Sequence, residues 1–529
     1  MTKPFLTISL LLTIALTAMA DTYRDVTFDA SQRYSHLIIS SRLSDFYSNT
    51  SKRGINVYDA DGKKVKSSSG TIGLDYVAGL VAKAVIEAAE YYSSETQARA
   101  WYYSIEDYAN TCVSSVPTTG GSLDNLNAAK MYPIIFDLTS SDGPFAAIAA
   151  SSTLANAKKG MERATQGLKD SNANYVITSK YGSECQGGWF HKSSYPQQMW
   201  LDGQYMGPAL LAQLLLHGYT ISGDATTDWK TITRQFDITW RYLWDASERL
   251  PYHAFSADPT GSYAKTWADP VSWHSQEFWG RACGWYFLAL VDIIEMMPGN
   301  IEYTPQVNYP VVDGAASVSY SSNCRERMKQ YLTMLADGLA ARQDATSGCW
   351  YQLLAHDGTY YATEYNGMKY APTYNYLEAS ASAIFTAAYL KALRLGYLDE
   401  QTYGTMAEKA YRGVVQQFLK QKADDSYELI NSCASAGLGG SKLRDGSAPY
   451  YLLGHDVTRI TTYTEGKILG AFILAATEYE RRQDSGRISS VISPMTATTA
   501  SHRAFTVSGI PAAPNHHGII ISNGRKMAR

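Results

Sequence analysis

The chain has 529 residues, of which 45% are hydrophobic and 18% are charged, and its formal net charge is −3. This composition excludes an intrinsically disordered chain and a protein with many membrane spans. The balance of 46 Lys and Arg against 49 Asp and Glu also argues against nucleic-acid binding, which needs a clustered basic face. The 40 Tyr and 11 Trp suit stacking on sugars, although aromatic rings fill protein cores as well.

Residues 1–20 are predicted to be a signal peptide. Lys3 precedes an apolar run from Phe5 to Ala15, and the small residues of 18–20 form a cleavage site before Asp21. The run is too short for a membrane-spanning helix, and a buried N-terminal helix is the alternative. We therefore expect an exported protein, periplasmic or secreted, with no membrane span.

Apolar residues recur with helical spacing along most of the chain. Val77, Leu80, Val81, Ala84 and Val85 lie on one face of a helix that follows Asp75-Tyr76. Similar stripes run through residues 97–113, 124–138, 144–167, 204–217, 226–247, 281–296, 323–342, 375–395, 401–420 and 463–482. Strands with alternating polarity are almost absent between them. The body is therefore predicted to be all-α, with eleven or twelve helices.

The length of the chain exceeds the limit of a single compact core, which implies two domains or a ring-shaped architecture. No repeat of fixed spacing indicates a common solenoid. The long connections hold most of the Trp, Gly, His and acidic residues, and loops gathered at one end of a helical ring would form a pocket. These connections are residues 168–203, 248–278, 297–322, 344–374 and 421–462. We predict an (α/α)6 barrel over residues 21–483.

The composition changes after residue 483. Residues 484–501 are rich in Ser and Thr and are predicted to be a linker. Residues 502–529 are predicted to be a short tail with two strands and a turn at Asn523-Gly524. This tail resembles the end of the sorting tails of many exported Bacteroidota proteins, with Ile520 where Tyr is usual. An edge strand without a sorting role is the alternative.

The six cysteines predict neither a disulfide framework nor a zinc site, because no two form a CxxC pair. They are Cys112, Cys185, Cys283, Cys324, Cys349 and Cys433. Most are expected to be buried thiols, with one or two incidental bridges as the alternative.

Two segments place carboxylates beside aromatic and basic residues. Residues 123–130 contain Asp124, and residues 187–206 contain Asp202 between Trp200 and Gly203. A carboxylate beside an indole in a partly dry pocket should have a raised pKa, as an acid that protonates a substrate near neutral pH requires. The alternative for each aspartate is a helix N-cap.

A third segment combines aromatic rings with a guanidinium group. Trp279, Arg281 and Trp285 lie within residues 273–285, and His253 precedes them. An aromatic wall with an arginine recognises a sugar that carries a carboxylate. Core tryptophans and a surface arginine are the alternative.

Together these segments resemble the unsaturated rhamnogalacturonyl hydrolases of glycoside hydrolase family 105, which are related to the unsaturated glucuronyl hydrolases. The resemblance covers residues 70–480 in the same order. It is carried by LDNLNAAK (123–130), GGWFHK (187–192), YPQQMWLDGQYM (195–206), FWGRACGW (278–285), NYLEASASAIF (375–385), CASAGLGG (433–440) and RDGSAPYYL (444–452). Ala282-Cys283 replaces the usual Gly-Asn, and Gln204 stands where Leu is common.

The resemblance implies an (α/α)6 barrel that acts on oligosaccharides with a 4,5-unsaturated uronic acid at the non-reducing end, by default rhamnogalacturonan fragments from pectin. It places the catalytic aspartate at Asp202 and a second pocket aspartate at Asp124. Substrate-binding residues are then Tyr76, His191, Lys192, His253, Trp279, Arg281 and Trp285. No metal or organic cofactor is called for.

The expected chemistry is hydration of the C4=C5 bond, with protonation at C4 by Asp202. Two alternatives stay open. An ordinary inverting glycosidase would cleave saturated oligosaccharides at C1 with a carboxylate pair such as Asp124 with Asp202 or Glu378. A sugar-binding protein without catalysis would use the same aromatic residues.

Overall fold

The computed structural model describes residues 23–45, 54–68, 72–305, 319–440 and 443–486, and the backbone of 505–506, 519–522 and 525–528. The predicted signal peptide and most of the predicted linker lie outside these residues. Within the described part of the chain, no helix has the length and apolar character needed to cross a bilayer.

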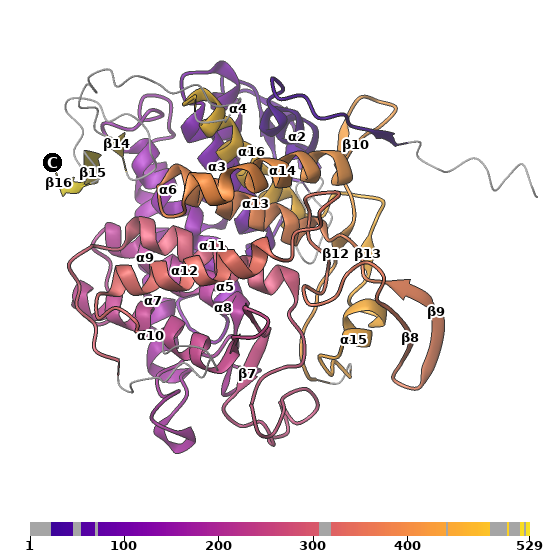
Figure 1. Cartoon of the computed structure of the whole chain (residues 1–529). Helices are drawn as coiled ribbons and strands as arrows, with labels where there is room; N and C mark the ends of the chain where they lie inside the picture. The colour runs from indigo at the N-terminus through magenta and orange to yellow at the C-terminus, as the bar shows by residue number, and fades with distance from the viewer. Residues whose placement is uncertain are drawn as a thin grey trace, which may run out of the picture.

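Two layers of helices form a closed ring, the predicted (α/α)6 barrel (Figure 1). The outer helices are α2 (Tyr34–Arg42), α4 (Thr96–Cys112), α7 (Thr153–Asn174), α10 (Ala225–Leu243), α12 (Cys324–Ala340) and α14 (Glu400–Phe418). The inner helices are α3 (Tyr76–Tyr91), α5 (Leu123–Asn127) with α6 (Met131–Thr139), α8 (Leu201–Met206) with α9 (Pro208–Leu216), α11 (Gly280–Met296), α13 (Ala379–Arg394) and α16 (Gly466–Asp484). The inner helices pack in this order, and α16 closes the ring against α3.

The inner helices approach one another closely because small residues lie at their contacts. A side chain at Gly79 of α3 would put its Cβ 2.4 Å from Ala128 Cα, and one at Gly470 of α16 would lie 2.6 Å from Leu80 Cγ. Every residue of α11 is buried, as expected for a helix that is surrounded by others. The core therefore follows the ring rather than filling one central sphere.

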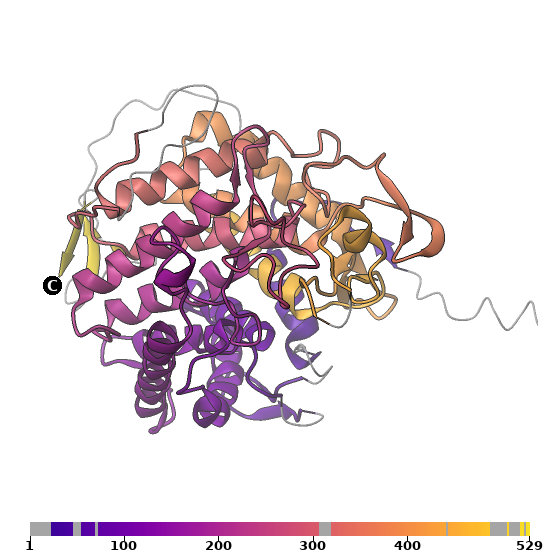
Figure 2. The same cartoon turned by 90° about the horizontal axis from the view of Figure 1, so that it is seen from below.

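Short strands occupy most of the connections that lead from an outer helix into the next inner helix; the connection from α4 to α5 has none. They are β2 (Val57–Tyr58), β3 (Lys64–Lys66), β4 (Gln198–Trp200), β5 (Trp244–Asp245), β6 (Leu250–Pro251), β7 (Ala254–Ser256), β8 (Tyr361–Tyr365), β9 (Met368–Tyr374), β10 (Leu419–Gln421), β11 (Tyr427–Leu429), β12 (Ser432–Cys433) and β13 (Arg459–Ile460). The antiparallel pairs include β4 with β7 and β12 with β13, while β1 (Arg24–Asp25) pairs with β10. The β8–β9 hairpin projects from the body beside the short helix α15 (Ala448–Leu453) (Figures 1 and 2).

The described residues of the tail form three strands, one more than predicted. Strands β14 (Phe505–Thr506), β15 (Ile519–Ser522) and β16 (Arg525–Ala528) form an antiparallel sheet in that order. The predicted turn at Asn523-Gly524 lies outside the described residues.

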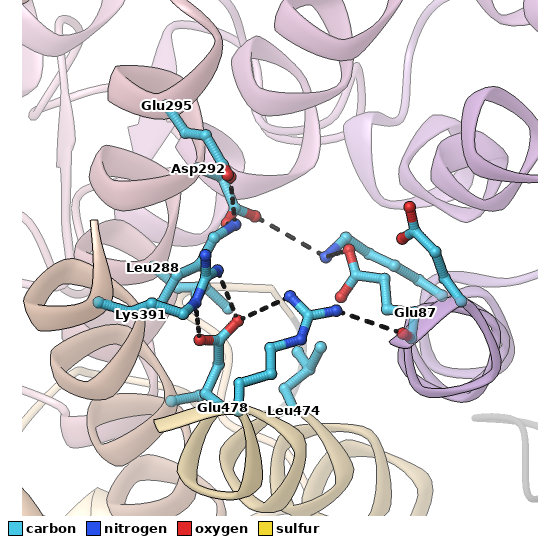
Figure 3. A pocket seen from close by; sticks show the side chains of 12 residues that line it. Glu87, Leu288, Asp292, Glu295, Lys391, Leu474 and Glu478 are labelled. Atoms are coloured by element: carbon cyan, nitrogen blue, oxygen red, sulfur yellow. Dashed lines mark hydrogen bonds and ion pairs between the residues drawn. The ribbon is translucent and has the colours of Figure 1, made fainter. Parts of the chain in front are cut away.

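Buried ion pairs close the end of the ring at which the inner helices terminate (Figure 3). Lys391 Nζ lies 2.6 Å from Asp292 Oδ1 and 2.9 Å from Glu295 Oε2, and Arg394 Nε lies 2.6 Å from Glu478 Oε2. These side chains come from α11, α13 and α16 and surround a small cavity of about 60 Å³. Buried charges are tolerated here because each has partners of opposite sign.

All six cysteines are buried free thiols, so the incidental bridges that we considered are absent. Among the described residues, no cluster of three or more His, Cys, Asp and Glu side chains could hold a metal ion.

Candidate active site

The N-terminal ends of the inner helices gather most of the predicted site residues at the other end of the ring. Tyr76 is the first residue of α3, while Asp124, Asp202 and Arg281 are the second residues of α5, α8 and α11. A helix N-terminus stabilises a nearby carboxylate through its unpaired N–H groups and its dipole. The fold therefore places both aspartates beside the unpaired N–H groups of a helix start.

Neither aspartate is a helix cap, which corrects the alternative considered from the sequence. Ser122 caps α5 by accepting a hydrogen bond from the backbone N–H of Asn125 at 3.4 Å. The N-cap residue of α8 is Trp200, which makes no side-chain capping bond. Both carboxylates are therefore available to other partners.

Asp124 binds two basic side chains from the loop before β4. Lys192 Nζ lies 2.6 Å from Asp124 Oδ2, and His191 Nε2 lies 3.4 Å from Oδ1. The backbone holds this loop in place, because Leu123 donates to the His191 carbonyl at 3.1 Å and His191 donates to the Gln198 carbonyl at 3.1 Å. Burial acts to lower the pKa of Lys192, but the charge of Asp124 outweighs it and the pKa is raised. Asp124 and Lys192 thus form a stable ion pair.

Asp202 is paired with an imidazole instead. His253 Nε2 lies 3.2 Å from Asp202 Oδ2, and the side chain of His253 is fully buried while that of Asp202 is 14% exposed. The pairing of β4 with β7, extended by the bond from Leu201 N–H to the His253 carbonyl at 3.0 Å, positions the two residues. The carboxylate can therefore meet a substrate while its partner cannot.

The pKa of Asp202 is lowered, whereas the sequence predicted a raised value. Burial acts to raise this pKa, but the hydrogen-bonding contact and charge of His253, together with the charge of His191, outweigh it. The prediction counted the indole and the dry surroundings but not the imidazoles that the fold brings in. In the substrate-free protein Asp202 is an ionised carboxylate.

The indole of Trp200 connects the two carboxylate pairs. It stacks between His191 and Tyr195, with ring centres 5.0 Å apart and planes within 10° in both cases. Its edge meets His253, with ring centres 5.2 Å apart. Burial lowers the pKa of His191, and the charge of Asp124 opposes this effect. The site is therefore a rigid aromatic frame with two acids.

Arg281 lies deeper than the aspartates and is only 2% exposed. Its guanidinium carbon lies 4.8 Å from the centre of the Trp279 ring, and its nitrogens donate to Ser380 Oγ at 3.2 Å and to the Cys433 carbonyl at 2.6 Å. Burial raises the pKa of the Tyr76 hydroxyl well above its usual value, and Arg281 partly opposes this effect. Arg281 thus supports the aromatic residues of the site, and its guanidinium N–H groups already donate hydrogen bonds within the protein.

Trp285 lies one helical turn further into the ring than Arg281. It stacks on Tyr205 with ring centres 4.9 Å apart and is 1% exposed. The structure therefore places it beneath the other predicted residues rather than beside the carboxylates.

Comparisons with known proteins identify the family. The profile of Glycosyl Hydrolase Family 88 matches residues 50–483. The chain belongs to this family. A family 105 glycoside hydrolase from C. acetobutylicum ATCC 824 has a similar structure, with a TM-score of 0.60 and 27% identity over 85% of this chain and 100% of that one. A possible family 105 member from Salmonella enterica shares the fold, with a TM-score of 0.54 and 20% identity over 86% and 93% of the two chains.

A curated relative is Protein Atu3128 from Agrobacterium fabrum. It is 29% identical over 238 residues, which cover 42% of this family 88 hydrolase and 84% of the relative.

Two further residues belong to the site of this family 88 hydrolase. The Tyr451 hydroxyl lies 2.7 Å from His253 Nδ1. Glu378 caps α13 and accepts hydrogen bonds from Ala381 N–H at 2.6 Å and Cys433 N–H at 2.7 Å. Both lie in segments that carry the family resemblance, but no local pattern singled out Tyr451. Glu378 is fully buried and committed to these bonds, so it is poorly placed to act as a second catalytic carboxylate.

Proposed function

We propose that this glycoside hydrolase hydrates the C4=C5 bond of an unsaturated uronic acid at the non-reducing end of lyase-generated oligosaccharides. The observation that carries this proposal is the carboxylate of Asp202, which is 14% exposed and lies against a buried imidazole, His253. The other carboxylate of the site, Asp124, is 12% exposed and is held in an ion pair by Lys192. The chemistry needs one acid that later acts as a base, not two carboxylates across an anomeric carbon.

The C4=C5 bond is part of an enol ether, so the ring oxygen donates electron density toward C4. Asp202 gives its proton to C4, and the positive charge develops at C5 and the ring oxygen. Water then adds to C5 and returns a proton to Asp202, which restores the acid. The resulting hemiketal opens and the neighbouring sugar is released. The first step requires a protonated aspartate, and the uronate carboxylate beside Asp202 favours that state because two negative charges repel.

The other acid supports binding. Asp124 and Lys192 present an acceptor and donors for sugar hydroxyls, and the side chain of Lys192 is 30% exposed. Lys192 is therefore more accessible than Arg281 for the uronate carboxylate. Local cations matter because the net charge of −3 offers an anionic substrate no general attraction.

We further propose that the substrate comes from rhamnogalacturonan and that the protein acts outside the cytoplasm. The family resemblance supports the first point, and the predicted signal peptide at residues 1–20 supports the second.

A panel of lyase products tests the function. Unsaturated rhamnogalacturonan, homogalacturonan and glucuronyl oligosaccharides would be followed by the ultraviolet absorbance of the C4=C5 bond. We expect the fastest absorbance loss with rhamnogalacturonan ends. Faster absorbance loss with glucuronyl ends would show that the substrate is a glucuronyl oligosaccharide instead. No absorbance loss with any member of the panel would refute the proposed function.

A further inference from the structure

Tyr451 reaches the candidate active site from a distant part of the chain. It lies on α15, in the connection between α14 and α16, and its ring stacks on Trp279 with ring centres 6.1 Å apart. The hydroxyl lies 2.7 Å from His253 Nδ1, while the other ring nitrogen lies 3.2 Å from Asp202 Oδ2. Tyr451, His253 and Asp202 therefore form a continuous chain of polar contacts.

The carboxylate decides how the protons are arranged along this chain. A neutral imidazole has one N–H and one acceptor nitrogen, and an ionised carboxylate only accepts. In the neutral ring, the 3.2 Å approach of Nε2 to the carboxylate of Asp202 favours a proton on Nε2, although these two atoms do not meet the geometry of a hydrogen bond, and Nδ1 then accepts from the Tyr451 hydroxyl. If the imidazole is protonated on both nitrogens, the same hydroxyl oxygen accepts from Nδ1, because a phenol can do either.

Hydrogen bonds of Gln352 hold the backbone of Tyr451 and the ring of Trp279, on which Tyr451 stacks, in place. Gln352 donates to the Tyr451 carbonyl at 3.4 Å, and its side-chain oxygen accepts from Trp279 Nε1 at 3.2 Å. The other titratable groups around the pair are His191, whose charge acts on Asp202, Cys283, whose thiol pKa is raised by burial and by the charge of Asp202, and Glu277, whose carbonyl accepts from the His253 backbone. None of these groups forms a hydrogen bond with Nδ1 in the described part of the chain, so this nitrogen depends on Tyr451.

We propose that Tyr451 is a positioning residue that holds His253 with Nε2, protonated in the neutral ring, beside the carboxylate of Asp202. It does not touch the reacting atoms and acts only through the imidazole. This inference rests on the proposed function, because it assigns Asp202 the catalytic role. Loss of the hydroxyl would let the ring exchange tautomers, and part of the population would then present a lone pair to the carboxylate.

A double-mutant cycle tests whether Tyr451 acts through His253. Tyr451→Phe should lower kcat by about tenfold or more while KM changes less than twofold, and in a His253→Gln background the same substitution should change kcat less than twofold. Tyr450→Phe is the matched control. It removes a neighbouring hydroxyl that accepts from Gly437 N–H at 2.9 Å and has no contact with His253. Equal factors in both backgrounds, or a loss confined to KM, would overturn the proposal.

A second experiment, NMR spectroscopy of the histidine side chains, needs no substrate. In protein labelled with ¹⁵N-histidine, the signals of His253, assigned by their loss in His253→Gln, should show a protonated Nε2 and an unprotonated Nδ1. Tyr451→Phe should convert them to a mixture of tautomers, and Tyr450→Phe should not. Identical His253 signals in the wild type and Tyr451→Phe would overturn the proposal. If the wild type leaves unsaturated ends intact, the proposed function fails, and these signals still decide the role of Tyr451.

Discussion

The two aspartates of the site differ in their partners, and this difference separates their roles. Asp124 faces the permanent charge of Lys192, whereas Asp202 faces the titratable ring of His253. An ammonium group keeps its charge near neutral pH, whereas an imidazole can lose its charge there. Asp202 is therefore the residue suited to carry a proton to the substrate.

Asp202→Asn should lower kcat by about 10³-fold, because an amide cannot supply the proton. Binding of the unsaturated oligosaccharide should change by less than about fivefold, since the side chain keeps its shape. Initial rates and equilibrium titration would measure the two effects. A variant that retains more than a tenth of wild-type kcat would show that another group is the acid.

Lys192→Met should raise KM by about tenfold with kcat within threefold, because the substituted side chain keeps its length but loses its charge-assisted contacts. Lys180→Met, on an exposed turn of the same connection, is the control and should leave KM unchanged. An effect on kcat alone would indicate that Lys192 takes part in the chemical step.

The sequence predicted Asp124, Asp202, His191 and Lys192 as site residues from compact motifs around two helix starts, and the structure brings these side chains together. Sequence reasoning did not identify the role of Tyr451, which is 198 residues from His253 along the chain. It also predicted the wrong direction for the pKa of Asp202, because that direction depends on imidazoles from separate loops.

At the scale of elements, the helix starts position the site. The predicted helix 204–217 begins earlier, at Leu201, and is interrupted at Gly207, because Pro208 has no N–H to continue the first segment. The spacing of apolar residues predicts that a helix is present here, but it does not predict the interruption at Gly207. At α13, Glu378 joins the helix start to Cys433 in β12.

Glu378→Gln should destabilise the protein by about 1–3 kcal/mol, because one amide oxygen replaces two carboxylate oxygens that accept several buried donors. Urea unfolding would measure the change. Glu364→Gln on the exposed β8 strand is the control, with an expected change within about 0.5 kcal/mol. No loss of stability in Glu378→Gln would mean that the cap is not needed.

At the scale of the whole molecule, the ring has two chemically different ends. The N-terminal ends of the inner helices hold the candidate active site, and the C-terminal ends hold the buried ion pairs of Figure 3. The spacing of apolar residues and the long connections predicted the ring and its loop-bearing end. The ionic closure was not predicted, because charges on separate helices become neighbours only when the ring closes.

The ionic end should make stability depend on pH. Burial acts to raise the pKa of Glu478, but the charges of Arg394 and Arg481 outweigh it and hold the pKa at about 2. Because this folded-state pKa lies below the unfolded value, Glu478 stabilises the fold above about pH 4.5, and this contribution is lost as the pH falls toward 2.

Glu478→Gln should therefore cost about 3 kcal/mol at pH 6 and progressively less as the pH falls below 4.5. Urea unfolding at several pH values would show the trend. Glu326→Gln, in the exposed pair with Lys329, should have little effect at any pH. A cost that is independent of pH would contradict the assigned role of the carboxylate.

The central claim is that the protein acts on the C4=C5 bond and not on the anomeric bond. The most direct measurement uses an unsaturated disaccharide analogue in which a CH₂ group replaces the glycosidic oxygen. Hydration predicts that the absorbance of the double bond disappears while the neighbouring sugar stays attached. If the analogue keeps its absorbance while the natural disaccharide is cleaved, the protein is an ordinary glycosidase and the claim is wrong.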